Sequence, residues 1–170
     1  MARLDQRTLD TRLISAAWDN DVDRAQELID AGADVNAKDK TEQSAYLITT
    51  SEGYLSLLNL TLRHGADVRS LDSFNGTGLI RAAERGHADV VARLLETEVE
   101  VNHVNELGWT ALLEAVILGD GSPRYQRTVR LLLDAGADPS ITDSDGVTPL
   151  EHAEAHGFDE IAAILRRTPR

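Results

Sequence analysis

One stretch decides the fold: Asp143-Ser144-Asp145-Gly146-Val147-Thr148-Pro149-Leu150-Glu151-His152-Ala153, which leads from a turn directly into a helix. Asp143 to Gly146 has turn chemistry, because short carboxylates bond nearby backbone amides and the glycine is free to adopt positive φ. Thr148 is a favoured helix N-cap, Pro149 suits the first helical position, and Glu151 completes a capping box. The stretch therefore predicts a turn followed by a short helix.

The same unit recurs along the whole chain, first at a spacing of 33 residues and finally of 38. The candidate cap residues follow these steps: Thr11, Ser44, Thr77, Thr110 and Thr148. The residues expected to close the first helix of each unit follow them too: Asn20, Gly53, Gly86, Gly119 and Gly157. A fixed period of this length is the signature of a repeat array. The longer last step places an insertion at residues 120–125, where Gly121 and Pro123 predict a projecting loop.

These residues resemble the ankyrin-repeat family. The resemblance is carried by Thr148-Pro149-Leu150, Ala82-Ala83, Gly86-His87 and Gly32-Ala33-Asp34-Val35-Asn36. It implies an all-α ankyrin-repeat solenoid of five helix-turn-helix units joined by short β-hairpin fingers. We expect a single domain over residues 1–170, with repeats at about 6–37, 38–70, 71–103, 104–141 and 142–167. The stretch Gly108-Trp109-Thr110-Ala111-Leu112-Leu113-Glu114-Ala115, followed by the insertion, resembles a bacterial subset of the family.

Two local expectations concern left-handed backbone. Asn75-Gly76 is a pair that favours positive φ at a finger turn. Glu98 stands where other units have Gly32, Gly65 and Gly136, at the end of a second helix. A left-handed residue usually ends a helix at such a position, and a side chain there costs about 1 kcal/mol. We therefore expect Glu98 to be a strained site.

The charge balance restricts the class of partner. Asp and Glu number 29 against 17 Lys and Arg, which gives a net charge of −12. A surface of this kind repels phosphate backbones, so we expect no nucleic-acid partner. A partner with a basic or apolar surface is favoured, although the acidity also has a simple use in keeping an elongated protein in solution.

The location of the protein is constrained by its cysteine content and its N-terminus. The chain contains no Cys, which is compatible with a reducing cytoplasm. The first residues contain no apolar run typical of a signal peptide, and no stretch approaches the length of a membrane span. We expect a cytoplasmic protein without membrane association; a start at Met1-Ala2 is also compatible with a removed export signal and a periplasmic location.

Two partial matches to metal-binding patterns lack residues that those patterns require. His152 and His156 are four residues apart, but the zinc-protease pattern requires Glu where Ala153 stands. Asp143 to Gly146 is similar to a calcium loop, yet Ile141 and His152 occupy positions that require carboxylates. We therefore predict no catalytic residue, no cofactor and no metal ion.

A partner surface is predicted instead. By resemblance, ankyrin arrays bind proteins on a concave face made of finger tips and the exposed sides of the first helices. The residues predicted there are Phe74, Leu107, Trp109, Ile117, Leu118, Val147, Trp18 and Arg85. Clustered exposed apolar residues usually mark an interaction site. The alternative is that the insertion folds over Ile117 and Leu118 and buries them.

The sequence thus favours a non-catalytic protein-protein interaction module, expected to be a monomer. A structural, self-associating repeat protein is an alternative. A third is a small-ligand-binding protein or enzyme that uses the groove near Trp109, where Glu106 and Glu114 are the titratable groups.

Overall fold

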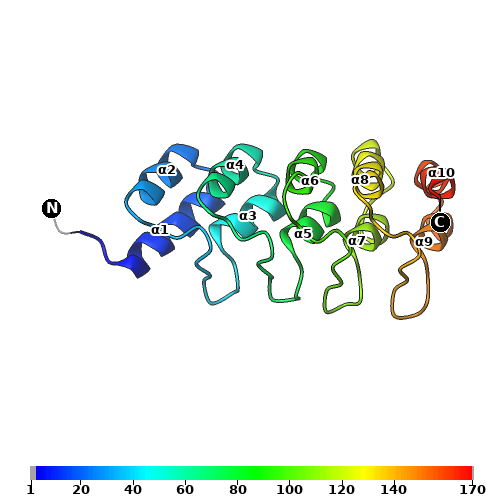
Figure 1. Cartoon of the computed structure of the whole chain (residues 1–170), viewed down its shortest axis with the longest axis horizontal. Coiled ribbons are helices and arrows are strands. Elements are labelled where there is room, and N and C mark those ends of the chain that lie inside the picture. Colours follow the sequence, from blue (N-terminus) through cyan, green and yellow to red (C-terminus); the bar gives the residue numbers. More distant parts are fainter. Residues whose placement is uncertain (1–2, 170) are drawn as a thin grey trace.

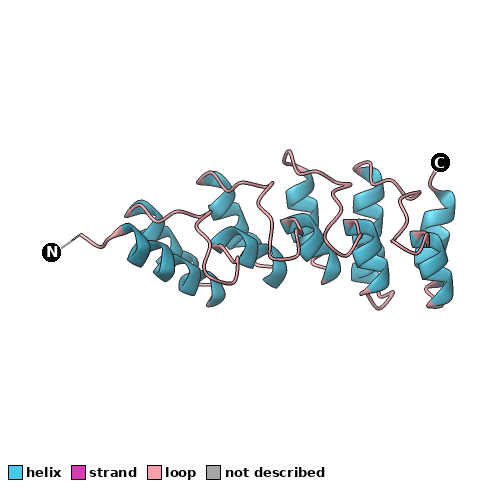
Figure 2. Cartoon of the chain, turned by 90° about the horizontal axis from the view of Figure 1, so that it is seen from below, coloured by secondary structure: helices cyan, strands magenta, loops and turns pink. Residues whose placement is uncertain are grey.

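The computed structural model describes residues 3–169, so Met1, Ala2 and Arg170 lie outside it. Within this range the chain forms ten helices: α1 (Gln6–Trp18), α2 (Val22–Asp30), α3 (Ala45–Glu52), α4 (Leu55–Arg63), α5 (Gly78–Glu84), α6 (Ala88–Leu95), α7 (Ala111–Ile117), α8 (Pro123–Asp134), α9 (Pro149–Ala155) and α10 (Asp159–Arg167). They form five pairs stacked side by side in one row (Figures 1 and 2). The predicted all-α repeat architecture is confirmed.

The helices form two layers. The first helices of the pairs contact one another in the order α1, α3, α5, α7 and α9, and the second helices contact one another in the order α2, α4, α6, α8 and α10. Four loops, which we call fingers, join each second helix to the next first helix and project from the array (Figure 1). Among the described residues, strand pairing in the fingers is limited to an isolated bridge between Leu71 and Thr77.

The predicted caps explain where most first helices begin. The hydroxyl groups of Ser44, Thr77, Thr110 and Thr148 each accept a hydrogen bond from the backbone amide three residues later. Thr11 was expected to do the same, and this prediction is wrong. The first helix begins earlier, because the Asp5 carboxylate accepts from the Thr8 amide at 2.9 Å and caps α1. Thr11 therefore lies inside the helix and donates to the Arg7 carbonyl.

The core consists of two clusters of mainly Leu, Ala, Val and Ile side chains, and both clusters include residues of α3 and α4. Leu13, Leu57, Leu79, Leu112 and Leu132 are among its fully buried members, contributed by five different helices. Each helix pair packs mainly against the neighbouring pairs in the row, as expected for a solenoid. Consequently no single central core holds the domain, and each pair depends on the pairs beside it.

The insertion was expected to project as a loop, and the structure corrects this. Pro123 begins α8, which is 12 residues long, so half of the insertion extends this helix. Tyr125 is buried, and its hydroxyl donates to the Glu84 carbonyl at 2.9 Å. Phe158 covers the loop from the other side so closely that a Cβ on Gly121 would lie 2.5 Å from its ring. The insertion therefore packs between neighbouring pairs.

The backbone confirms the expected positive φ at Asn75 and corrects the expectations for Gly76 and Glu98. Asn75 has a φ of 55°, but Gly76 does not adopt positive φ. Gly32, Gly65 and Gly136 have φ values of 105°, 84° and 97°, whereas Glu98 has no positive φ. After α6 the chain turns through Thr97, whose amide and hydroxyl both donate to the Leu94 carbonyl. Glu98 is thus not a strained site.

None of the helices in the described range has the length and apolar character needed to cross a membrane.

Candidate partner-binding groove

The tip of each finger is held in shape by one Asp or Asn, which we call the turn residue. Asp39, Asp72, Asn105 and Asp143 each accept, at Oδ1, hydrogen bonds from the backbone amides two and four residues later. For Asp72 these bonds measure 2.8 Å to Phe74 and 2.9 Å to Gly76. This side-chain turn replaces a strand ladder and fixes the finger tip. At Asp143 the amide of Val147 is the leading reason why the pKa of the carboxyl lies below its ordinary value.

A second contact ties three of the fingers to the helix that follows. The turn residue bonds the side chain nine positions later: Asp72 to Arg81 at 2.7 Å, Asn105 to Glu114 at 2.6 Å and Asp143 to His152 at 2.7 Å. The chemistry is complementary in each pair, since an acid meets a base and an amide donor meets a carboxyl group. The side chains of His152 and Arg81 therefore have structural partners within their own repeats.

The histidine pair considered as a metal site does not form one. The His152 and His156 rings are 6.4 Å apart, and His156 stacks on Phe158. Within residues 3–169, no group of three or more His, Cys, Asp or Glu side chains is placed to hold a metal ion.

Between the α4–α5 finger and the α6–α7 finger lies a cavity of about 340 Å³, which we call the α5–α7 pocket. The two fingers are joined across it, because the Glu106 amide donates to the Phe74 carbonyl at 2.8 Å. The pocket is lined by Ser51, Asp72, Phe74, Gly76, Ile80, Arg81, Glu84, Arg85, Asn105, Leu107, Glu114 and Leu118. It combines apolar side chains with a few polar groups, as small binding pockets usually do.

Glu114 is the unusual group in this pocket. Its side chain is 3% exposed, and its Oε2 atom has no hydrogen-bond partner. Burial raises the pKa of Glu114 to about 7, with smaller contributions from the charges of Glu84 and Asp72; the hydrogen bond from Asn105 opposes the shift. Buried polar atoms are nearly always paired, so an unpaired one at a pocket indicates a site able to accept a donor.

The structure brings four of the eight predicted partner residues together. Phe74, Leu107 and Leu118 line the α5–α7 pocket with exposed fractions of 56%, 48% and 48%, and Arg85 lies beside them. Leu118 is thus not covered by the insertion. The other four lie apart from this lining: Trp109, Ile117 and Val147 are half-buried, and Trp18 is 45% exposed at the end of α1.

The groove continues beyond the α5–α7 pocket. A more open hollow of about 570 Å³ shares Glu84, Arg85 and Leu118 with it and adds Glu52, His87, Arg124 and Tyr125. The His87 ring nitrogen Nε2 lies 2.9 Å from the Ser51 carbonyl, which ties two neighbouring pairs together. We call the two hollows together the finger groove. A partner segment lying in it would cross α5 and reach the base of α8.

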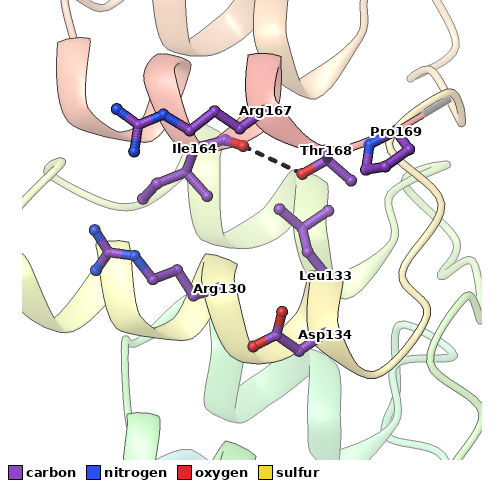
Figure 3. Close-up of a pocket in the computed structure, with 7 residues that line it drawn as sticks. All are labelled: Arg130, Leu133, Asp134, Ile164, Arg167, Thr168 and Pro169. Carbon is purple, nitrogen blue, oxygen red and sulfur yellow. Dashed lines mark hydrogen bonds between the residues drawn. The ribbon is translucent and has the colours of Figure 1, made fainter.

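A further cavity lies between α8 and α10, away from the fingers. Figure 3 shows side chains from both helices around it, with Arg130 and Arg167 at one side and the Thr168 hydroxyl bonded to the Ile164 carbonyl. None of its lining side chains has a buried polar atom without a partner. The finger groove is therefore the better candidate for binding.

Sequence reasoning missed Asp72, Arg81 and Asn105 as parts of this site. The signal was present in the repeats, because the turn residue and the residue nine positions later are chemically complementary in three consecutive units. Glu114 was noted only as a titratable group near Trp109. Its burial and its missing partner depend on how neighbouring repeats pack, which one repeat alone does not show.

Comparison with known proteins agrees with the geometry. A family model described as three copies of ankyrin repeats matches residues 45–143, and a single ankyrin-repeat model matches residues 9–40. YahD, an ankyrin repeat protein of Escherichia coli strain K12, is 47% identical over 141 residues, or 82% of this chain and 70% of YahD. A longer relative, the ankyrin repeat and KH domain-containing protein mask-1 of Caenorhabditis elegans, is 30% identical over 157 residues. The aligned region is 91% of this chain but only 6% of mask-1.

Solved structures show the same architecture. An ankyrin repeat domain from Acinetobacter baumannii AYE superimposes with a TM-score of 0.88 at 53% identity, covering 91% of this chain and 79% of that one. A second ankyrin repeat protein, EF0377, gives a TM-score of 0.88 at 39% identity, covering 92% and 80%.

Proposed function

Because this chain belongs to the ankyrin-repeat family, whose members generally act as protein-interaction modules, we propose that it binds another protein in the finger groove. The observation that carries the proposal is the exposure of Phe74, Leu107 and Leu118 around one pocket. A cluster of large exposed apolar side chains usually marks an interaction site, whereas single exposed apolar residues are common on any surface. The fingers hold the rim in a fixed shape, so binding requires little ordering of the groove.

The proposed role is non-catalytic. Several charged groups of the finger groove are engaged with one another: Arg81 with Asp72 at 2.7 Å and Arg85 with Glu52 at 3.3 Å. Glu114 is bonded to Asn105, so the remaining acid is Glu84. This arrangement supports recognition by shape and charge, in which no bond of the partner is made or broken.

We further propose a monomer in the cytoplasm whose partner has a basic or apolar surface. The net charge of −12 supports a basic partner and opposes nucleic acid, and the lack of Cys agrees with a reducing compartment. Light scattering over a range of concentrations tests the monomer. A mass that rises with protein concentration would favour self-association through Phe74, Leu107 and Leu118, which we call the apolar rim.

An affinity pull-down with the intact chain tests the proposed function. The bait is compared with a triple variant, Phe74→Ser, Leu107→Ser and Leu118→Ser, which removes the apolar rim. Val104→Ser is the matched control, because Val104 is 44% exposed but does not line the pocket.

We expect the wild type and Val104→Ser to retain the same partner protein equally well. The triple variant should bind this partner at least about tenfold more weakly, since buried apolar anchors dominate interface energies. The proposal fails if the wild type retains no specific protein, or if the triple variant retains the same one equally well.

A further inference from the structure

The carboxyl groups that line the α5–α7 pocket, Asp72, Glu84 and Glu114, outnumber its two guanidinium groups. Of its charged side chains, Arg81 is neutralised by Asp72 and Arg85 by Glu52. Within the described chain, no hydrogen bond or ion pair reaches the Glu84 side chain, and Glu114 has only the neutral Asn105 amide. Two carboxyl groups in one pocket thus lack a cation.

The buried atom adds a specific demand. Glu114 Oε2 is buried without a donor, which leaves the desolvation cost of that oxygen uncompensated in the free protein. A donor brought by a partner would recover this cost, and a cationic donor would also favour the ionised form of Glu114, whose pKa burial raises to about 7. The Nε atom of Arg81 is a second buried group without a partner, and a backbone carbonyl of the same partner segment would supply its acceptor.

The rim of the pocket suits a long aliphatic stem. Phe74, Leu107 and Leu118 are the exposed apolar residues of the lining, whereas Glu114 is buried and Glu84 is half-buried. Lysine and arginine side chains combine an apolar stem with a charged head, and their cations also favour an aromatic face such as that of Phe74. A neutral apolar side chain would fit the rim but would leave Glu114 unpaired.

We propose that the α5–α7 pocket receives a lysine or arginine side chain of the partner, whose stem packs on Phe74, Leu107 and Leu118 and whose charged head pairs with Glu114 and Glu84. The proposal rests on the proposed function and adds to it the chemistry of the partner: a cationic residue flanked by apolar ones.

The test uses N-acetyl-arginine amide as the probe and N-acetyl-citrulline amide, a neutral molecule of nearly the same shape, as its counterpart. Each is titrated to about 50 mM into intact protein with labelled methyl groups, because a single side chain binds in the millimolar range. The resonances of Ile80, Leu107 and Leu118 report on the pocket.

We expect the arginine probe to shift these methyl resonances and to bind about five- to tenfold more tightly than the citrulline probe, since a charge-assisted hydrogen bond is replaced by a neutral one. Glu114→Gln should abolish the preference and Glu84→Gln should reduce it. Glu106→Gln is the matched control: it removes the same charge from an exposed acid that does not line the pocket, and should keep the preference.

Equal binding of both probes, no binding by either, or a preference that survives both Glu114→Gln and Glu84→Gln would overturn the proposal. If Glu114→Gln does not fold, Glu84→Gln decides alone, because Glu84 is half-buried and tolerates the change. The pull-down with the apolar rim is independent of this result. A partner lost from the triple variant but indifferent to Glu114→Gln would leave the proposed function standing and remove only the cationic anchor.

Discussion

Replacing Glu42 by glycine should stabilise the protein. Glu42 has a φ of 63°, and the equivalent finger positions hold Asn75, Gly108 and Gly146 with φ values of 55°, 82° and 78°. In all four fingers the amide of this residue donates to the carbonyl three residues earlier, so the turn itself imposes the conformation. Glu42 is the one residue of the four whose type rarely adopts left-handed backbone.

The magnitude follows from three contributions. Left-handed backbone costs a residue with a side chain about 1–2 kcal/mol, which glycine avoids. Against this, glycine loses about 0.4–1 kcal/mol through the greater freedom of the unfolded chain. The Lys38–Glu42 ion pair, 3.4 Å long and exposed, contributes little. We expect Glu42→Gly to raise the free energy of unfolding by about 0.5 kcal/mol.

Glu98→Gly is the matched control, because the substitution is the same and Glu98 has no positive φ. Here only the unfolded-state effect applies, and stability should fall by about 0.5–1 kcal/mol. Urea and thermal denaturation of the two variants should therefore separate their melting temperatures by about 3–5 °C, with the wild type between them. Changes of the same sign and size in both variants would refute the reasoning.

Three further predictions concern the groove. Burial holds the pKa of Glu114 at about 7 instead of 4.5, so between these pH values the folded chain keeps a proton that the unfolded chain releases. The stability of the wild type relative to Glu114→Gln should therefore fall by up to about 3 kcal/mol as the pH rises from about 4.5 to about 7. Urea melts that give the same stability difference at about pH 5 and at about pH 8 would contradict this. Tyr125→Phe should lose about 1 kcal/mol, the bond to the Glu84 carbonyl, and Tyr125→Ala about 3–5 kcal/mol; equal losses in denaturant melts would show that the ring is not packed. Trp109→Ala should cost about 1–2 kcal/mol of stability because the side chain is half-buried, and calorimetry should show it to weaken partner binding less than Leu118→Ala does; the reverse order would restore Trp109 as the main anchor.

The repeat spacing was sufficient to predict the helix pairs, because local signals and packing agree there. Ser44, Thr77, Thr110 and Thr148 cap helices as the spacing indicates. Thr11 kept the spacing but not the role, because the Asp5 carboxylate caps a helix that already begins at Gln6 and places Thr11 inside it.

The conformation of Glu98 was mispredicted because only the glycine position was compared between repeats, and the position that bonds this glycine was not. The carbonyl groups of Gly65 and Gly136 each accept a hydrogen bond from an asparagine of the preceding repeat, Asn36 and Asn102. The corresponding residue before Glu98 is Arg69, which makes no such bond. At Gly65 and Gly136 the left-handed glycine therefore occurs together with an asparagine of the preceding repeat, whereas Glu98 and Arg69 stand at the corresponding two positions and lack both features.

The insertion was misjudged because Gly121 and Pro123 are typical of a loop by themselves. Their environment depends on Tyr125 and Phe158, which fill the space beside them from their own and the next repeat. Similarly, position within the repeat predicted exposure for Phe74, Leu107 and Leu118, but it did not predict that Trp109 lies outside the same pocket. Contacts between repeats decided both cases.

Hydrogen exchange on the complex with the captured partner tests the central claim most directly. Binding in the finger groove should slow amide exchange in residues 72–85 and 105–118, which carry the two fingers, α5 and α7. Exchange in α2, α4 and α6 of the second layer should change little. Protection confined to that second layer, with the fingers unaffected, would contradict the account.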